Sequence, residues 1–217
     1  MAYRRTERTE ARLAEARERI VAAAVDQVAD GGYASASVQA VAARAGVATG
    51  SVYRHFPSKA ELFGEVFRRQ ANQELGVLEE IATHDSPALE RLAQATEVLA
   101  RRALASPTLA YAQIAEPVEQ EVEAERLVLR RGYRDAFARI LADGIERGEL
   151  EPHDTQTYGA AILGAISEAL VGPLSDPKPR NREALIASLV QFTTGRAYGT
   201  LPSTTDFEGI VERAWQQ

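Results

Sequence analysis

The chain of 217 residues contains no cysteine, so it has no disulfide framework, no thiolate nucleophile and no cysteine-based metal site. It also lacks an apolar run near the roughly 20 residues that cross a bilayer, and its start shows no signal-peptide pattern. Aromatic residues make up only 6% of the chain, and its alanine and leucine content with few β-branched runs favours helix. We therefore expect a cytoplasmic, all-α protein without a membrane partner.

Familiar catalytic motifs are absent as well. The sequence has no G-x-S-x-G, no P-loop and no HExxH, and the segment 46–51 lacks the GK[ST] ending of a phosphate-binding loop. His84 and His153 each precede an aspartate in an apparent turn, so they are either solvated or share a metal site. We expect no catalytic residue, no metal and no cofactor; an enzyme that binds a small molecule stays an alternative.

The net charge of −6 is unevenly divided along the chain. Residues 1–60 hold nine arginine and lysine residues against six aspartate and glutamate residues, whereas residues 61–217 hold 16 against 25. A basic part on an acidic remainder concentrates the attraction for phosphate at one end of the molecule. The acidic balance of the whole chain therefore does not exclude DNA. The arginines before residue 13 form either a solvated end or an arm that contacts DNA.

The segment from Ser37 to Phe56, SVQAVAARAGVATGSVYRHF, predicts two short helices joined by a tight turn. Gly46 stands at the corner, where a residue without Cβ can adopt the left-handed conformation that ends the first helix. Ala42 is small enough for the second helix to cross closely, and Val52 is placed to fill the angle between them. This spacing is typical of a helix-turn-helix, but an ordinary α-hairpin in a helical core shows the same pattern.

The flanks of this motif carry a more specific pattern. The runs DGGYASASV and GSVYRHFPSKAELF resemble the N-terminal signature of the TetR family of bacterial transcriptional regulators. The resemblance implies a three-helix DNA-binding domain at 1–57, with its helix-turn-helix at 37–56, and a helical effector-binding and dimerisation domain at 58–217. It further implies a homodimer that binds a palindromic double-stranded DNA operator, most simply a repressor released by a small-molecule effector. The matching positions are Tyr33, Ala42, Gly46, Val47, Gly50, Tyr53, His55, Phe56, Lys59, Leu62 and Phe63.

The resemblance also assigns residues that dock the protein on the DNA backbone. It implies that Tyr53, His55 and Lys59 contact phosphates and so position the domain. Ser37 fits the N-cap of the first helix of the motif, and the same hydroxyl could face a phosphate at that helix end. The two roles of Ser37 are compatible.

The second helix of the motif is the recognition helix by the same resemblance, with Thr49, Gly50 and Ser51 facing the bases. The commonest family pattern here is Ser-Lys-Gly, whereas this sequence has Ala48, Thr49 and Gly50. Alanine cannot cap a helix, and a lost cap typically costs about 1 kcal/mol, although Thr49 could cap one residue later. The missing lysine removes one candidate contact with the DNA.

The remainder of the chain is divided by turn clusters into helical segments. The first, 58–82, is expected to be the only continuous rod between the two domains, so that any signal must move it. The last two are small or apolar on nearly all faces, which requires a second surface to bury them. In the resembled family these two pack against their twofold mates as a four-helix bundle; burial within one chain is the alternative. The expected interface residues are Ile162, Ile166, Leu170, Ile186, Leu189 and Val190.

The effector pocket is expected in the core of the second domain, although aromatic residues at helical spacing are also explained as ordinary core. Few charged residues fall on the helix faces that carry the candidate lining residues, so we expect a mostly apolar or aromatic effector. A helical protein-interaction module that does not bind DNA is a further alternative, and the role of the amphipathic tail at 200–217 is not defined by its sequence. The candidate lining residues are Phe67, Leu99, Tyr111, Ile114, Tyr133, Phe137 and Tyr158.

Overall fold

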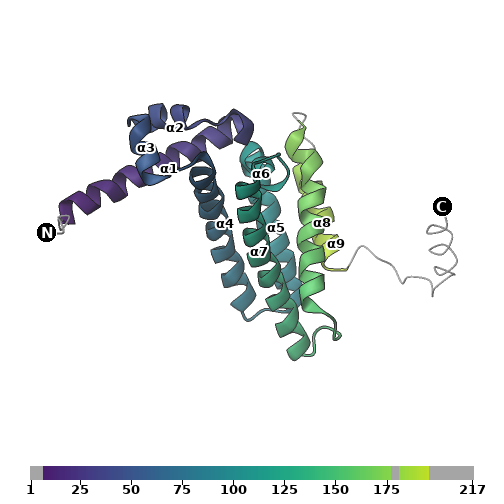
Figure 1. Ribbon diagram of the computed structural model, residues 1–217. Helices are drawn as coiled ribbons and strands as arrows, with labels where there is room; N and C mark the ends of the chain where they lie inside the picture. Colours follow the sequence, from purple (N-terminus) through teal and green to yellow (C-terminus); the bar gives the residue numbers. More distant parts are fainter. Residues whose placement is uncertain (1–6, 177–180, 196–217) are drawn as a thin grey trace, which may run out of the picture.

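The computed structural model of the protein describes residues 7–176 and 181–195, which form nine α-helices and no strand (Figure 1). This confirms the all-α prediction. We call α1 to α3 the head and α4 to α9 the body. The tail from residue 200 lies outside the described residues. The helices are α1 Glu7–Ser35, α2 Val38–Ala45, α3 Thr49–His55, α4 Lys59–Thr83, α5 Ala88–Ala105, α6 Pro107–Ile114, α7 Gln120–Glu146, α8 Thr155–Ser175 and α9 Arg182–Thr193.

The head contains the predicted helix-turn-helix, with α2 and α3 packed along α1 (Figure 1). Ser37 caps α2, because its Oγ accepts a hydrogen bond from the Ala40 N–H at 3.2 Å. The chain turns at Gly46, whose φ of 66° lies in the left-handed region. Ala42 and Val52 are buried where α2 and α3 meet. The turn at Gly46 and the packing of Ala42 and Val52 between the two helices are therefore those that the sequence predicts.

The end of α1 is broken at Gly32. Gly32 has a φ of 78° and a ψ of 175°, so the helical turn that follows it up to Ser35 points in a new direction. Tyr33 comes directly after the break, is buried, and meets the ring of Phe63 in α4 edge-on, with 5.3 Å between the ring centroids. Tyr33 thus holds the head against the body through its contact with α4.

The body is a helical bundle in which α7 lies against both α4 and α8 (Figure 1). Its first helix, α4, begins after Ser58, whose Oγ accepts a hydrogen bond from the Glu61 N–H at 3.0 Å. Phe67 of α4 and Phe137 of α7 are fully buried in the core. Helix α9 packs on α5 and closes the bundle at the C-terminal side.

The head and the body meet at two places rather than one. Helix α4 leads out of the head, as predicted, and ion pairs join it to α1, with Arg17 Nη2 lying 3.0 Å from Glu65 Oε1. In addition, the C-terminal part of α1 packs against α6. Helix α4 is the continuous helix that leads from the head into the body, as expected, and the contact between α1 and α6 is a second connection that sequence periodicity does not show.

Helices α8 and α9 bury most of the side chains expected at a dimer interface. Within a single chain the five aliphatic residues are buried and Val190 is half-buried. The outer faces of the two helices carry smaller residues and Tyr158, which is 53% exposed. The five buried residues are Ile162, Ile166, Leu170, Ile186 and Leu189.

Helix α8 also departs from the expectation that no stretch is apolar enough to cross a bilayer. Among the described residues, Thr155–Ser175 meets that test by length and composition, and 28% of its apolar window is buried inside the chain. The helix continues through Pro173 to Ser175. One such helix is weak evidence for a membrane span, and it identifies α8 chiefly as a helix with an apolar outer surface.

Candidate DNA-binding surface and ligand cavity

The outer face of the helix-turn-helix is made by α3. Gly50 and Tyr53 are exposed, with 45% of Tyr53 accessible, and Thr49 and Ser51 are half-buried. Ala48 occupies the N-cap position and makes no side-chain hydrogen bond to the helix, as its side chain requires. The first turn of α3 therefore presents only small side chains outward, a surface that fits the floor of a major groove.

Two of the predicted phosphate contacts have neighbours that define their chemistry. Lys59 Nζ lies 3.5 Å from Glu119 Oε1 of the body, so its charge is already partly engaged. Burial, together with the positive charges of Arg17 and Arg54, holds the pKa of His55 below its ordinary value. Near pH 7 His55 is therefore neutral and can offer a phosphate an N–H group but not a charge.

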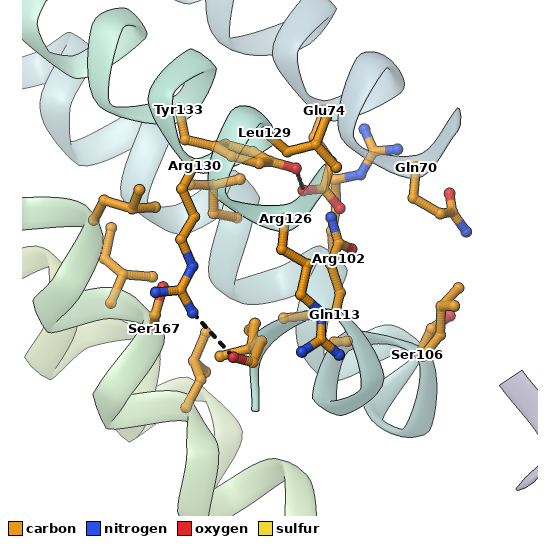
Figure 2. Close-up of a pocket in the computed structure, with 18 of the residues that line it drawn as sticks. Gln70, Glu74, Arg102, Ser106, Gln113, Arg126, Leu129, Arg130, Tyr133 and Ser167 are labelled. Carbon is orange, nitrogen blue, oxygen red and sulfur yellow. Dashed lines mark hydrogen bonds between the residues drawn. The ribbon is translucent and has the colours of Figure 1, made fainter. Parts of the chain in front are cut away.

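The body contains a cavity of about 270 Å³ among α4, α5, α6, α7 and α8 (Figure 2). Most of its wall is aliphatic, and the polar groups come mainly from α4, α5 and α7. The apolar lining residues are Leu99, Ala103, Ala105, Leu109, Ala110, Ile114, Leu129, Leu163, Ile166 and Leu170. The polar ones are Gln70, Glu74, Arg102, Ser106, Gln113, Arg126, Arg130, Tyr133 and Ser167.

Three arginines line this cavity, Arg102 from α5 and Arg126 and Arg130 from α7 (Figure 2). Arg126 is only 4% exposed, and its Nη1 donates to the carbonyl of Glu116 at 2.9 Å. Arg130 Nη2 donates to the carbonyl of Ile114 at 3.1 Å. Charged groups therefore reach this cavity although few of them fall on the helix faces that carry the candidate lining residues, because arginine stems can run along apolar walls while their guanidinium groups reach polar partners.

An acid stands in the same cavity. Tyr133 Oη donates to Glu74 Oε2 at 2.6 Å, and Figure 2 shows the two side chains meeting at the wall. Burial raises the pKa of Glu74, although the hydrogen bond from Tyr133 and the charge of Arg102 act against that rise. Burial and the Glu74 carboxylate also raise the pKa of Tyr133, so its phenol stays protonated and donates. The cavity thus combines an apolar wall, three cations and one paired acid.

Two family descriptions match the sequence in consecutive parts. Residues 20–66 match the bacterial regulatory proteins of the tetR family, and residues 85–170 match the tetracyclin repressor-like C-terminal domain. The chain belongs to the TetR family. Its function is that of a DNA-binding, ligand-responsive transcriptional repressor, in agreement with a helix-turn-helix joined to a body that contains a cavity.

Relatives of this TetR-family chain include a regulator of fatty acid metabolism and a transcriptional repressor. The fatty acid metabolism regulator protein of Bacillus subtilis is 26% identical over 176 residues, which cover 80% of this chain and 91% of that protein. The transcriptional repressor KstR of Mycobacterium tuberculosis is 29% identical over 154 residues, 70% of this chain and 67% of its own. The crystal structure of Bacillus subtilis FadR in complex with stearoyl-CoA superposes with a TM-score of 0.73 at 25% identity, over 82% of this chain and 97% of that one.

Only three of the seven residues predicted to line the effector pocket lie at this cavity. Leu99, Ile114 and Tyr133 line it. Aromatic residues at helical spacing fill a core equally well without a cavity beside them, which explains why the rest lie elsewhere. Phe67 and Phe137 belong to the buried core, Tyr111 is half-buried on α6, and Tyr158 is exposed at the start of α8.

The three arginines of the cavity are not among the residues predicted from the sequence, although the sequence contains a signal for one of them. Val122, Arg126, Leu129 and Tyr133 recur at helical spacing along one face of α7, and all four are buried. An arginine in line with an apolar stripe indicates a buried cation with carbonyl or ligand partners. No comparable signal marks Arg102, which is a half-buried residue near the end of α5.

The histidines of the body have local partners. His84 Nδ1 lies 3.2 Å from Ser86 Oγ, and His153 Nδ1 lies 2.7 Å from the carbonyl oxygen of Glu151. Within residues 7–176 and 181–195, no group of three or more histidine, aspartate or glutamate side chains is placed to hold a metal ion.

The raised pKa of Glu74 predicts a pH-dependent cost of folding. Below the unfolded pKa of about 4.3 both states hold the proton and the cost is absent; it grows as pH rises toward the folded pKa and is complete above it. Glu74→Gln keeps an acceptor for Tyr133 but removes the buried charge. We therefore expect Glu74→Gln to unfold at higher urea concentration than the wild type at pH 8, with a smaller difference at pH 5.

The control for this measurement is Glu80→Gln, which changes an exposed acid on the same helix. The urea midpoint of Glu80→Gln should equal that of the wild type at both pH values. An equal gain for Glu74→Gln at pH 5 and pH 8 would contradict the assignment of a raised pKa.

Proposed function

We propose that the protein is a cytoplasmic homodimer that represses transcription from a near-palindromic operator. Each head places α3 in one major groove, with the first turn toward the bases and Tyr53, His55 and Lys59 toward phosphates. The two grooves then lie about 34 Å apart on one side of the duplex. The observation that supports this most directly is the outward surface of α3, which is small and polar and stands on a closely packed helix-turn-helix. We place the boundary between the DNA-binding domain and the effector-binding domain between residues 57 and 58.

The dimer forms, in this proposal, through the outer faces of α8 and α9. These faces contain small residues such as Ala161 and Gly164 together with the large exposed rings of Tyr158 and Phe192. Small residues let two helices approach closely, and exposed rings add apolar area to a contact. Burial of this surface against a second copy accounts for a helix as apolar as α8 in a soluble regulator.

The effector, we propose, is an amphipathic anion with a long acyl chain, of the class of long-chain acyl-CoA thioesters. The apolar wall suits a hydrocarbon chain, and Arg102, Arg126 and Arg130 suit a thioester carbonyl or an anionic group. The stearoyl-CoA bound to the similar Bacillus subtilis regulator supports the same class. This proposal adds an anionic group to the mostly apolar or aromatic effector expected from the sequence.

Fluorescence anisotropy with short duplexes that tile the DNA beside the protein's own gene tests this function. One duplex should bind with a steep dependence on salt, and stearoyl-CoA should lower its affinity at least about tenfold, whereas free coenzyme A should not. Protein that ignores every duplex at low ionic strength would instead support an interaction module. Tight DNA binding that no acyl-CoA changes would refute the effector class alone.

A further inference from the structure

A cluster of contacts joins the head to the corner between α6 and α7, which comprises residues 115–119. The carboxylate of Glu116 accepts two backbone hydrogen bonds from the head, from the N–H of Tyr33 to Oε2 and from the N–H of Ala34 to Oε1, both at 2.8 Å. Tyr33 Oη donates to Glu119, which also pairs with Lys59. We call Glu116 and Glu119 with these partners the clamp.

The clamp depends on the break in α1. The positive φ of Gly32 turns the next two N–H groups toward the body, where a single carboxylate can accept both. A Cβ at Gly32 would stand 3.0 Å from Glu116 Oε2, closer than side chains ordinarily approach. The positive φ therefore favours glycine at this position, and any larger residue would also push the Glu116 carboxylate aside.

The corner that carries the clamp is held from the cavity side by the two α7 arginines. Arg126 donates to the carbonyls of Ala112 and Glu116, and Arg130 donates to that of Ile114, so the last carbonyls of α6 depend on them. Arg126 Nε is buried and has no hydrogen-bond partner among the described residues, although its side chain lines the cavity. The Nε–H group of Arg126 thus lacks a hydrogen-bond acceptor at the point where an effector would lie.

We infer that Arg126 senses the effector and passes its presence to the head through Glu116 and Glu119. An anionic oxygen in the cavity forms stronger hydrogen bonds with a guanidinium group than neutral backbone carbonyls do, and it competes with the Glu123 carboxylate, whose Oε2 lies 3.0 Å from Arg126 Nη1. It therefore draws Arg126 away from the end of α6, the corner shifts, and the clamp loosens its hold on α1. The head then loses the orientation that the operator needs. This coupling rests on the proposed function, because it presumes a DNA-binding head and an effector in the cavity.

The first test needs neither DNA nor effector. In Arg126→Met, amide hydrogen exchange at Tyr33 and Ala34 should be several-fold faster than in the wild type, because Arg126 holds the corner that carries Glu116 and makes no hydrogen bond of its own to either head residue. The matched control is Arg134→Met on the same helix, whose guanidinium pairs with Asp135 and should leave these amides unchanged. Unchanged exchange in a folded Arg126→Met protein would overturn the coupling.

The second test separates sensing from binding and covers the case in which Arg126→Met does not fold. In Glu116→Gln, the side-chain amide can accept from only one of the two head N–H groups, and the residue lies outside the cavity lining. Stearoyl-CoA should bind with an affinity within about twofold of the wild type, whereas the ratio of operator affinities without and with stearoyl-CoA should fall from tenfold or more toward one. Glu121→Gln, an exposed acid at the start of α7, is the control and should keep the wild-type ratio.

The outcomes distinguish the coupling from the function on which it rests. A Glu116→Gln protein that keeps the wild-type ratio overturns the clamp as the connection. A wild-type protein that binds its operator but does not respond to stearoyl-CoA refutes the effector class, and the exchange rates of Arg126→Met then decide the coupling by themselves.

Discussion

Gly50→Glu is expected to lower operator affinity at least about 100-fold while leaving the free protein as stable as the wild type or slightly more so. Gly50 is exposed in the first turn of α3, and no atom outside its immediate surroundings lies within 4 Å of a Cβ added there. A carboxylate in the first turn of a helix interacts favourably with the helix dipole, and replacing glycine removes a helix-disfavouring residue. The same carboxylate would face the phosphates and base edges, where like charges in contact cost several kcal/mol.

The control for this variant is Gly76→Glu. Gly76 is likewise exposed, helical and free of atoms within 4 Å of an added Cβ, but it lies in α4, in the body. Its effect on net charge is identical, so a general repulsion of DNA would weaken both proteins equally. Anisotropy with the operator duplex and urea unfolding measure the two effects. If Gly50→Glu bound the operator as tightly as Gly76→Glu, α3 would not be the helix that enters the groove.

Asp143→Ala is expected to lower the free energy of unfolding by about 2 to 3 kcal/mol. Its partner Arg91 is the largest fully buried side chain in the described residues, being 1% exposed. Arg91 Nη1 donates to the Ala82 carbonyl at 2.8 Å, its Nη2 pairs with Asp143, and its Nε has no hydrogen-bond partner among the described residues. Removing the carboxylate leaves a buried cation with one neutral acceptor, which is costlier than losing the pair as a whole.

Two further variants make this prediction specific. Asp85→Ala removes an ion pair with Arg147 at 3.1 Å, but its side chain is 97% exposed, so we expect a change below about 0.5 kcal/mol. Adding Arg91→Met to Asp143→Ala should restore part of the lost stability, because the buried charge disappears. Urea denaturation measures all three proteins. A loss for Asp143→Ala no larger than that for Asp85→Ala would show that Arg91 is satisfied without its carboxylate.

The head is predictable from sequence because its geometry is set over short distances. The corner at Gly46, the small residue at Ala42 and the plug at Val52 lie within eleven residues, and backbone conformation with local packing decides their roles. Caps behave in the same way: Ser37 and Ser58 both accept the hydrogen bonds that their positions indicate. The division of the body into helical segments is predictable for the same reason, because turn residues end helices through local backbone conformation.

The cavity and the head–body contacts are not predictable in this way, because they depend on which helix faces meet in space. Tyr133 and Phe137 are one helical turn apart on α7, yet only Tyr133 reaches the cavity. The clamp joins residues more than 80 positions apart, Tyr33 with Glu116 and Glu119. In the sequence, Glu116 precedes a proline in a turn and Glu119 precedes a helix start rich in acids, and nothing in their spacing indicates a partner in the head.

The contacts between head and body bypass the recognition helix. They engage α1 through the backbone N–H groups of Tyr33 and Ala34 and through Tyr33 itself, while α3 packs on α1 and α2. Mutations that change which promoter is recognised can therefore accumulate on α3 without disturbing the response to the effector. After gene duplication, a chain built in this way can give rise to paralogues that answer to the same metabolite but control different genes.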